Sequence, residues 1–413
     1  MLYKREILAN ILAHCDKKEI ILLTGARQTG KTTLLRQIEV EIREKRPAFF
    51  LNLENLEFVK LLNDSPENLF KIFPLNKGSI KRQCVLVDEI QYLKNPTNFL
   101  KYIYDEYADH IQLIVSGSSA FYIDKKFKDS LAGRKKIFYI YPLSLRDFLI
   151  FKERSDILPY IPKVFSLNNF LLLETLPHVF NRDLETLVEE LMIYGGYPRA
   201  VLSEGAEEKK AVLEEIATAY IKKDILEADI KGSEKYYDLF KLLSAQIGGQ
   251  INTNELANTL DMSRPTISHY LYIMQKSFHF ALVRPFSRNH RKEIGKMPKG
   301  YFYDAGLRNY FINNFNPLAS RQDPGQVLEN FVFKQLIDKL HLDDIKYWRT
   351  VAGDEVDFVI KEEAAFEVKY RSTGFAQNKY DAFVKRYPRI PLHPVSHLIA
   401  DDDNKRTWHA WMI

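Results

Sequence analysis

Residues 25–32 form the pattern Gly-x-x-x-x-Gly-Lys-Thr, between an apolar segment and an amphipathic one. The apolar run at 20–23 predicts a strand, and the helical spacing that starts at Lys31 predicts a helix. A glycine-rich turn between a strand and a helix is typical of a loop that binds phosphate groups. The first chemistry that the sequence indicates is therefore the binding of a nucleoside triphosphate.

Each residue type in this loop has a physical use. Gly25 and Gly30 allow backbone torsions in which successive amides point inward at phosphate oxygens. Lys31 would reach the β- and γ-phosphates of ATP, and Thr32 would bind Mg²⁺. Thr33 follows in the first helical turn, whose partial positive charge favours an anion. We expect these residues to bind ATP together with magnesium.

A fully apolar strand that ends in two acids follows downstream, in the segment CVLVDEIQ. Asp88 can hold Mg²⁺ through water, and Glu89 can polarise the water that attacks the γ-phosphorus. The next predicted strand, 111–117, ends in the hydroxyl of Ser116. Because parallel strands end at the same edge of a sheet, we expect Ser116 to lie beside Asp88 and to sense the γ-phosphate. The alternative is that two acids at a strand end merely face solvent.

This half of the chain resembles the AAA-type ATPases. The resemblance covers residues 1 to about 230 and rests on GARQTGKT, VLVDEIQ, Ser116 and Arg134, the arginine before the fifth predicted strand. It implies an ATPase with a P-loop core at 1–150 and a helical lid at 151–232.

The resemblance also implies roles for three further residues. An arginine at the position of Arg134 often completes the neighbouring subunit's site, which implies a homo-oligomer, with a hexameric ring as one form. The sequence leaves open that Arg134 pairs with an acid on its own surface. In related ATPases a glycine-proline turn that opens a lid helix contacts the adenine, and a basic residue there touches the γ-phosphate. In YGGYPRAV, Pro198 and Arg199 match these positions.

Residues 253–277 predict two helices separated by a polar turn, which is typical of a helix-turn-helix. The second helix would present side chains suited to phosphates and base edges. These residues are Arg264, Thr266, His269 and Lys276. Two strand-like runs, FHFALVRPF and KGYFYDAG, follow, so we predict a winged helix at 233–318. Such a module binds DNA or, alternatively, serves only for protein contacts.

The chain carries a net charge of +5, and its placement favours DNA. Between 284 and 299 there are six basic residues and one acid, Glu293, so this segment holds the whole excess, six minus one. The basic residues are Arg284, Arg288, Arg291, Lys292, Lys296 and Lys299. A local basic patch attracts phosphates, although a solvated loop is the simpler alternative. The order of core, lid and winged helix resembles branch-migration motors and replication-initiator ATPases, both of which handle duplex DNA.

A second set of acids lies near the C-terminus, in VDFVI and AFEVK. If 361–363 form a three-residue loop, Asp357 lies opposite Glu367 and the flanking apolar residues face the core together. Lys369 shares the face of these acids, and a helix supplies Glu329. Carboxylates can hold Mg²⁺ while a lysine orients the attacking hydroxide, so we predict a metal site formed by Glu329, Asp357 and Glu367.

The acid followed by Glu-x-Lys resembles the restriction-endonuclease-like nucleases, which implies catalytic roles for Asp357, Glu367 and Lys369 in a domain at 319–413. Such modules can also be inactive DNA clamps, and acids on a strand face are ordinary surface. The whole architecture resembles a prokaryotic AAA-type ATPase family with a C-terminal domain of unknown function. The predicted fold class is α/β, with a P-loop core, a helical lid, a winged helix-turn-helix and a nuclease-like α/β domain.

Composition sets limits on these predictions. The chain has two cysteines and no run near the about 20 apolar residues that a membrane span needs, so we expect a cytoplasmic protein without a disulfide framework. The prediction is an oligomeric Mg²⁺-ATPase that binds and remodels or translocates DNA, with branched DNA as one candidate substrate. Two alternatives stay open. One is an ATP-gated nuclease of defence or mobile-element type, and the other is a signalling ATPase that binds a protein partner.

Overall fold

The computed structural model describes most of the chain. The described residues are 3–75, 82–117, 131–167, 178–228, 230, 232–287, 293, 295–399 and 407–413. Contacts divide the chain into two compact units. The first is Met1–Tyr141 with Lys276–Phe278, and the second is Pro142–Gln275 with His279–Ile413. The predicted lid, winged helix and C-terminal domain therefore fall in the second unit, apart from Lys276–Phe278 of the winged helix, and the predicted boundaries between them remain predictions.

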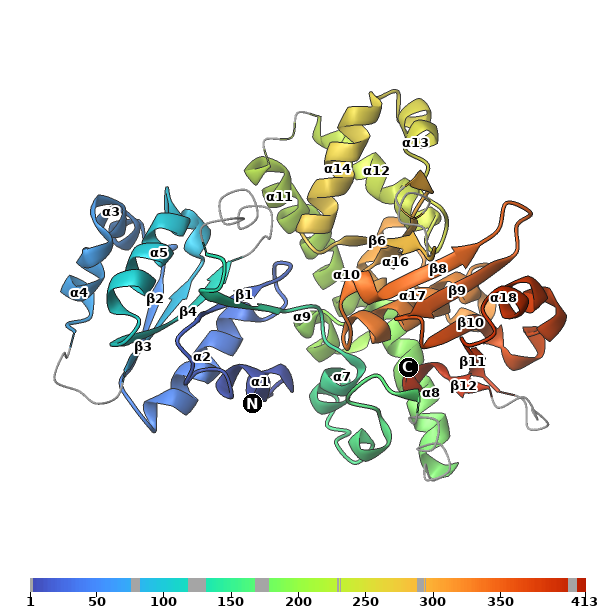
Figure 1. The fold of residues 1–413 in the computed structure, drawn as a ribbon, viewed down its shortest axis with the longest axis horizontal. Helices are drawn as coiled ribbons and strands as arrows, with labels where there is room; N and C mark the ends of the chain where they lie inside the picture. Colours follow the sequence, from blue (N-terminus) through green and yellow to red (C-terminus); the bar gives the residue numbers. More distant parts are fainter. Residues whose placement is uncertain are drawn as a thin grey trace. The chain divides into compact units, whose positions relative to one another are not determined.

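Five parallel strands form the sheet of the first unit, in the order β2-β3-β4-β1-β5 (Figure 1). The strands are β1 (Ile20–Thr24), β2 (Ala48–Asn52), β3 (Gln83–Asp88), β4 (Ile111–Gly117) and β5 (Lys135–Tyr139). β1, β3 and β4 are buried at every position, as expected for a parallel sheet with both faces covered. Because β4 lies between β1 and β3, the ends of the glycine-rich strand and of the acidic strand both lie next to the end of β4.

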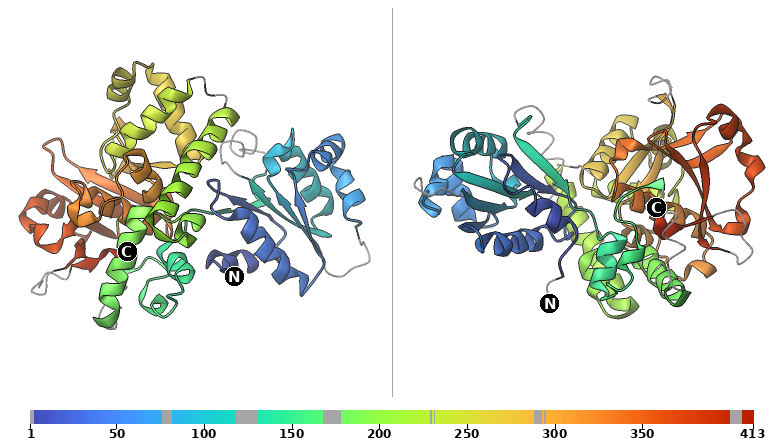
Figure 2. Two further views of the ribbon diagram at one scale, coloured as in Figure 1. Left: turned by 180° about the vertical axis from the view of Figure 1, so that it is seen from behind. Right: turned by 60° about the horizontal axis from the view of Figure 1, so that its bottom comes forward.

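Helices cover both faces of this sheet. They are α1 (Ile7–Leu12), α2 (Lys31–Arg43), α3 (Leu56–Asp64), α4 (Leu69–Ile72) and α5 (Pro96–Tyr107). Helices lie on both sides of the sheet in Figure 2. Leu23 packs in one core with Leu34 of α2, whereas Leu22 packs in another with Phe99 of α5. Because successive side chains of β1 point to opposite faces of the sheet, the interior of this unit is divided into two cores. The predicted α/β class, with a parallel P-loop-type sheet, is confirmed.

The second unit begins with helices and continues into a mixed sheet. The helices are α7 (Leu145–Phe151), α8 (His178–Tyr194), α9 (Pro198–Leu202), α10 (Gly205–Glu215), α11 (Ile221–Glu227), α12 (Ser233–Ala245), α13 (Thr253–Leu260), α14 (Arg264–Lys276), α16 (Ala305–Phe311), α17 (Pro324–Ile337) and α18 (Asp381–Arg386). A π-helical turn at Ile216–Tyr220 joins α10 to α11. None of the described helices is long and apolar enough to cross a membrane.

Seven strands form the sheet of the second unit, in the order β12-β11-β10-β9-β8-β6-β7. They are β6 (Phe280–Pro285), β7 (Lys299–Phe302), β8 (Ile345–Arg349), β9 (Glu355–Ile360), β10 (Ala364–Arg371), β11 (Leu392–Leu398) and β12 (Trp408–His409). α12, α13 and α14 followed by the antiparallel pair β6–β7 give the element order predicted for a winged helix. β6 also pairs in parallel with β8. The predicted boundary between 318 and 319 therefore does not separate two sheets.

The C-terminal strands are buried on both faces. We expected Phe358 and Phe366 to face the core, and they do pair directly. However, Val359 and Ala365, which alternate with them, are also buried, in a second cluster with residues around α18. The acids on this second face therefore lie in a protein interior rather than on an exposed strand face.

Candidate nucleotide site and carboxylate cluster

The turn between β1 and α2 has the backbone that a phosphate-binding loop needs, but its two glycines act differently. Gly30 has a φ of 89°, in the left-handed region, as predicted. Gly25 is not in that region. A Cβ on Gly25 would lie 2.1 Å from the carbonyl oxygen of Ile140, so this glycine permits a close approach of two backbones. The prediction of a special torsion was thus right for Gly30 and wrong for Gly25.

Lys31 lies within the loop that it was predicted to serve. Its Nζ donates to the carbonyl oxygens of Gly25, at 2.9 Å, and Ala26, at 2.7 Å, and the residue is buried. Gly30 is the N-cap of α2, and no described side chain caps this helix end. The first amides of α2 and the ammonium group therefore face the same loop, an arrangement that suits a phosphate group.

Asp88 is the meeting point of the predicted magnesium residues. The hydroxyl of Thr32 donates to Asp88 Oδ2 at 2.6 Å, and the hydroxyl of Ser116 donates to Asp88 Oδ1. The predicted contact between Ser116 and Asp88 is confirmed, and its cause is the register of β3 and β4, which pairs Val87 with Val115. A hydroxyl and a carboxylate at this spacing are the oxygen donors that Mg²⁺ prefers, so these residues fit the metal of an ATP complex.

Glu89 follows β3 with a left-handed φ of 58°. Its amide donates to the hydroxyl of Ser116 at 3.2 Å, which fixes the backbone beside the magnesium residues. The side-chain amide of Gln91 donates to Glu89 Oε2. Gln91 was not among the predicted site residues, because its contact with Glu89 depends on the short 3-10 turn Ile90–Tyr92.

The remaining residues predicted for the core lie farther from this centre. Thr33 is exposed in the first turn of α2. Arg134 pairs with Asp105 at 2.8 Å, which matches the alternative of an ion pair on its own surface. Lys135 pairs with Ile20 at the start of β1, whereas the glycine-rich loop follows the other end of β1. A strand of this length spans about 16 Å, more than an arginine side chain, so Arg134 cannot reach a phosphate in its own loop.

Pro198 and Arg199 lie in the second unit, at the start of α9, and Arg199 pairs with Glu215 at 2.6 Å. The glycines before them have a packing role that the sequence analysis did not foresee. The amide of Gly196 donates to Asp304 Oδ2 at 2.7 Å, and a Cβ on Gly195 would overlap that carboxylate. A contact with adenine and γ-phosphate stays a prediction.

The segment around Asp304 forms a buried polar network. Burial raises the pKa of Asp304 to about 6, although backbone amides of Leu307 and Gly196 hold it lower. Burial would also raise the pKa of Asp323, but the hydrogen bond from Arg321 and the charge of Arg308 lower it to about 2. Asp304, the N-cap of α16, thus connects this helix to the glycine pair that precedes α9.

The predicted loop and register of the C-terminal acids are correct. β9 and β10 pair Ala364 with Ile360 and Phe366 with Phe358, which leaves a three-residue loop and places Asp357 opposite Glu367. The amide of Val368 donates to Asp357 Oδ2 at 2.9 Å.

The predicted metal site is not assembled, because a lysine lies among its carboxylates. Lys299 Nζ lies 2.8 Å from Glu329, 2.6 Å from Glu355 and 3.1 Å from Asp357. In the described part of the chain, no three acid, histidine or cysteine side chains are placed to hold a metal ion. Glu329, Asp357 and Glu367 are thus not gathered around a vacant centre in this structure, and metal binding by them stays a prediction.

The acids of this cluster have altered affinities for protons. Burial and the charge of Asp357 raise the pKa of Glu367 to about 8, although Lys369 holds it lower. Burial and Asp357 likewise raise the pKa of Glu329 to about 7, against the charge of Lys299. Lys369 contacts Glu367 Oε1 and the carbonyl oxygen of Val368 at 3.2 Å.

The residues predicted to bind DNA divide into several groups. On α14, Arg264 and His269 are exposed, Lys276 is half-buried, and Thr266 shares a hydrogen bond of 2.7 Å with the hydroxyl of Ser263. In the basic segment, Arg284 and Lys296 are exposed, whereas Lys299 is buried and belongs to the acid cluster. Arg288, Arg291 and Lys292 lie outside the described residues. The exposed basic patch thus has one charge fewer than predicted, because Lys299 is buried.

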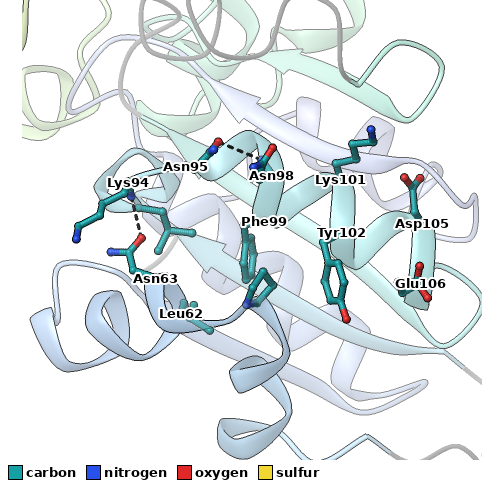
Figure 3. A pocket seen from close by; sticks show the side chains of 12 residues that line it. Leu62, Asn63, Lys94, Asn95, Asn98, Phe99, Lys101, Tyr102, Asp105 and Glu106 are labelled. Atoms are coloured by element: carbon teal, nitrogen blue, oxygen red, sulfur yellow. Dashed lines mark hydrogen bonds between the residues drawn. The ribbon is translucent and has the colours of Figure 1, made fainter.

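A cavity of about 510 Å³ lies elsewhere in the first unit, between the α3 region and α5 (Figure 3). Phe99 and Tyr102 point toward the segment of Leu62, and the rim is polar. Its lining includes Asp105, the partner of Arg134, but none of the residues predicted to bind ATP.

Family models match three consecutive parts of the chain. Residues 17–149 match an AAA domain, 185–318 match a domain of unknown function (DUF8612), and 324–407 match a second domain of unknown function (DUF4143). The site and the matches together define an AAA-type domain at the front of the chain. The chain thus carries an AAA domain followed by two domains of unknown function, and an AAA domain with a C-terminal domain of unknown function is the architecture that its motifs predicted.

Relatives along most of the chain occur in bacteria and archaea. An uncharacterized protein of Haemophilus influenzae is 23% identical over 91% of this chain and 87% of its own length. An uncharacterized protein of Methanocaldococcus jannaschii is 28% identical over 77% of this chain and 67% of its own length. One from Mycobacterium tuberculosis is 23% identical over 90% and 75%.

Solved structures match at low similarity. The Orc1 protein of Aeropyrum pernix in complex with DNA has a TM-score of 0.31 and 14% identity, and covers 76% of this chain and 93% of its own. RuvB of Thermotoga maritima has a TM-score of 0.33 and 16% identity, over 68% and 89%.

Proposed function

We propose that the protein is a Mg²⁺-dependent ATPase that binds DNA through its winged-helix region and works as a homo-oligomer. The observation that carries the ATPase part is the contact of Thr32 and Ser116 with the two oxygens of Asp88. Glu89 lies next to it in the chain, at the position of a general base.

The contacts in the glycine-rich loop support the same reaction. Lys31 Nζ donates to the carbonyl oxygens of Gly25 and Ala26, two partners that a phosphate can replace. A phosphate there would also accept from the first amides of α2, which have no side-chain cap among the described residues.

DNA binding is supported by the helices and by charge. α14 follows α13 after a tight turn and exposes Arg264 and His269 at its N-terminal half, the part of a recognition helix that contacts base edges. Arg284 and Lys296, on and after β6, add exposed positive charge. Cleavage of DNA is not part of the proposal, because Lys299 lies among the acids that would have to bind metal.

The oligomer part depends on Arg134. This residue lies at the N-terminal ends of the strands, whereas its own glycine-rich loop follows the C-terminal end of β1. Any role in phosphate chemistry would therefore be at a neighbouring subunit. Its contact with Asp105 is partly exposed, and a surface ion pair of this kind is weak, about 0–1 kcal/mol, so it can be exchanged for a phosphate.

The experiment is phosphate release by the full chain with Mg²⁺, alone and with single-stranded, duplex and four-way-junction DNA. We expect hydrolysis in the wild type and stimulation by at least one DNA form. Lys31→Ala removes hydrolysis, whereas Lys45→Ala, an exposed lysine after α2, leaves it unchanged. Absence of Mg²⁺-dependent hydrolysis contradicts the ATPase part. An unchanged rate together with no mobility shift of DNA at low salt contradicts the DNA part and favours a protein partner.

A further inference from the structure

Lys299 is among the most deeply buried charged groups of the second unit. It is the first residue of β7 and is 2% exposed. Its ammonium lies 2.8 Å from Glu329 on α17, and 2.6 Å and 3.1 Å from Glu355 and Asp357 on β9. Its ammonium donates hydrogen bonds to Glu329 Oε1 and Asp357 Oδ1, and it forms an ion pair with Glu355. The charge of Lys299 is therefore balanced by carboxylates inside the protein.

A second residue of β7 strengthens this arrangement. Because side chains on a strand alternate, Tyr301 lies on the same face as Lys299. Its hydroxyl donates to Glu329 Oε1 at 2.6 Å, the oxygen that also accepts from Lys299. The tyrosine ring stacks on Phe333 of α17, with ring centroids 4.9 Å apart. β7 is thus attached to α17 by an ion pair, a hydrogen bond and a stacked ring pair.

The position of Lys299 leaves no room for a metal ion between Glu329 and Asp357. A divalent cation such as Mg²⁺ binds carboxylate oxygens at about 2.1 Å and needs several of them on one centre. Glu329 and Asp357, two of the predicted ligands, already direct oxygens at the lysine nitrogen. An ammonium and a metal cannot occupy the same point, and their mutual repulsion would be large in a buried site.

The second lysine of the region is held differently. Lys369 contacts Glu367 Oε1 and a backbone carbonyl, and about a third of its side chain is exposed. It therefore sits at the margin of the cluster, whereas Lys299 lies at its centre.

We propose that Lys299 is the resident cation of this cluster in place of a divalent metal, and that it clamps β7 to α17 and β9. The C-terminal module consequently takes up no catalytic metal and does not hydrolyse phosphodiester bonds. The clamp also gives the seven-stranded sheet a fixed connection between its β6–β7 hairpin and its acid-bearing strands. This proposal is independent of ATP hydrolysis in the first unit.

The test uses the full chain with Asp88→Asn, which removes the metal ligand of the nucleotide site. Free Mn²⁺ is measured by electron paramagnetic resonance during titration without nucleotide, and supercoiled plasmid is incubated with Mg²⁺ or Mn²⁺. We expect no Mn²⁺ site that depends on Asp357 and no nicking. An Mn²⁺ site or a nicking activity that is lost in Asp357→Asn overturns the proposal. This arm leaves Lys299 intact, so it does not depend on the folding of a lysine variant.

The second arm replaces the lysine. Lys299→Met in the same background should lower the melting temperature by about 5 °C or more, because the carboxylates lose their cation, and Mn²⁺ should reverse part of that loss through Asp357. The matched control is Lys296→Met, an exposed lysine three positions earlier, which should melt as the parent does. Equal melting of the Lys299→Met and Lys296→Met variants overturns the proposed clamp.

Discussion

The nucleotide site and the C-terminal cluster both place acids on strands of a sheet, yet they meet the demand for positive charge in opposite ways. At Asp88, hydroxyls of Thr32 and Ser116 contact the carboxylate, and hydroxyls leave room for an added cation. At Asp357, the ammonium of Lys299 already supplies the charge. Acids on neighbouring strands therefore do not by themselves indicate a metal site. What decides is whether the chain brings its own cation.

The largest effect should come from Glu89→Gln in the nucleotide site. This change keeps the size of the side chain but removes the base, so the rate of hydrolysis should fall about 10²- to 10⁴-fold while ATP affinity is retained. Steady-state phosphate release and binding of a fluorescent nucleotide measure the two quantities. A rate within a factor of two of the wild type would show that Glu89 is not the base.

Arg134→Ala tests whether the nucleotide site is completed by a second subunit. We expect hydrolysis to fall by about 10²-fold or more, as when an arginine that stabilises the transition state is removed, with nucleotide affinity unchanged. Mixing this variant with inactive Glu89→Gln chains should restore part of the rate, because each chain supplies what the other lacks. If Arg134→Ala lowered nucleotide affinity instead, Arg134 would act in the site of its own subunit, which contradicts its position at the N-terminal ends of the strands.

The C-terminal cluster should make the stability of the protein depend on pH. The pKa of Glu367 is raised from 4.5 to about 8, so between these values the unfolded chain releases a proton that the folded chain keeps. Stability from this group is therefore lost as pH rises from about 4.5 to 8. Glu367→Gln should flatten the decline of the melting temperature over this interval by about 5 °C. Exposed Glu363→Gln is the control, and an equal slope in both variants would contradict the raised pKa.

The smallest expected effect concerns Gln91. Its amide donates to Glu89 Oε2, an oxygen that would otherwise be open to the attacking water. Gln91→Ala should raise the basal hydrolysis rate by about 10-fold, which corresponds to the low end of the energy of one hydrogen bond to a charged group. A fall in rate would mean that Gln91 holds Glu89 in its working position instead.

The same comparison explains what could be predicted from the sequence. The contact of Ser116 with Asp88 follows from parallel strands ending at one edge, and the register of Asp357 and Glu367 follows from a loop of three residues. These are consequences of local pattern. Lys299 and Glu329 are 30 positions apart, and Gly196 and Asp304 are 108 apart, so their contacts depend on how distant elements pack. Lys299 was assigned to a basic surface because its charge is visible in the sequence and its burial is not.

The pairing of β6 with β8 is a similar case. Nothing in the runs 280–285 and 345–349 marks them as neighbours, because each is an ordinary short strand between polar segments. The contacts of Lys299 and Tyr301 with Glu329 depend on this tertiary packing. The nuclease-like pattern could therefore be recognised in the sequence, whereas the lysine that lies among its acids could not.

The most direct measurement is the number of Mn²⁺ ions bound per chain by the Glu89→Gln variant in the presence of ATP. We predict one ion, which appears only with nucleotide and is lost when Asp88→Asn is added. Two ions per chain, or one that survives Asp88→Asn and disappears with Asp357→Asn, would contradict it.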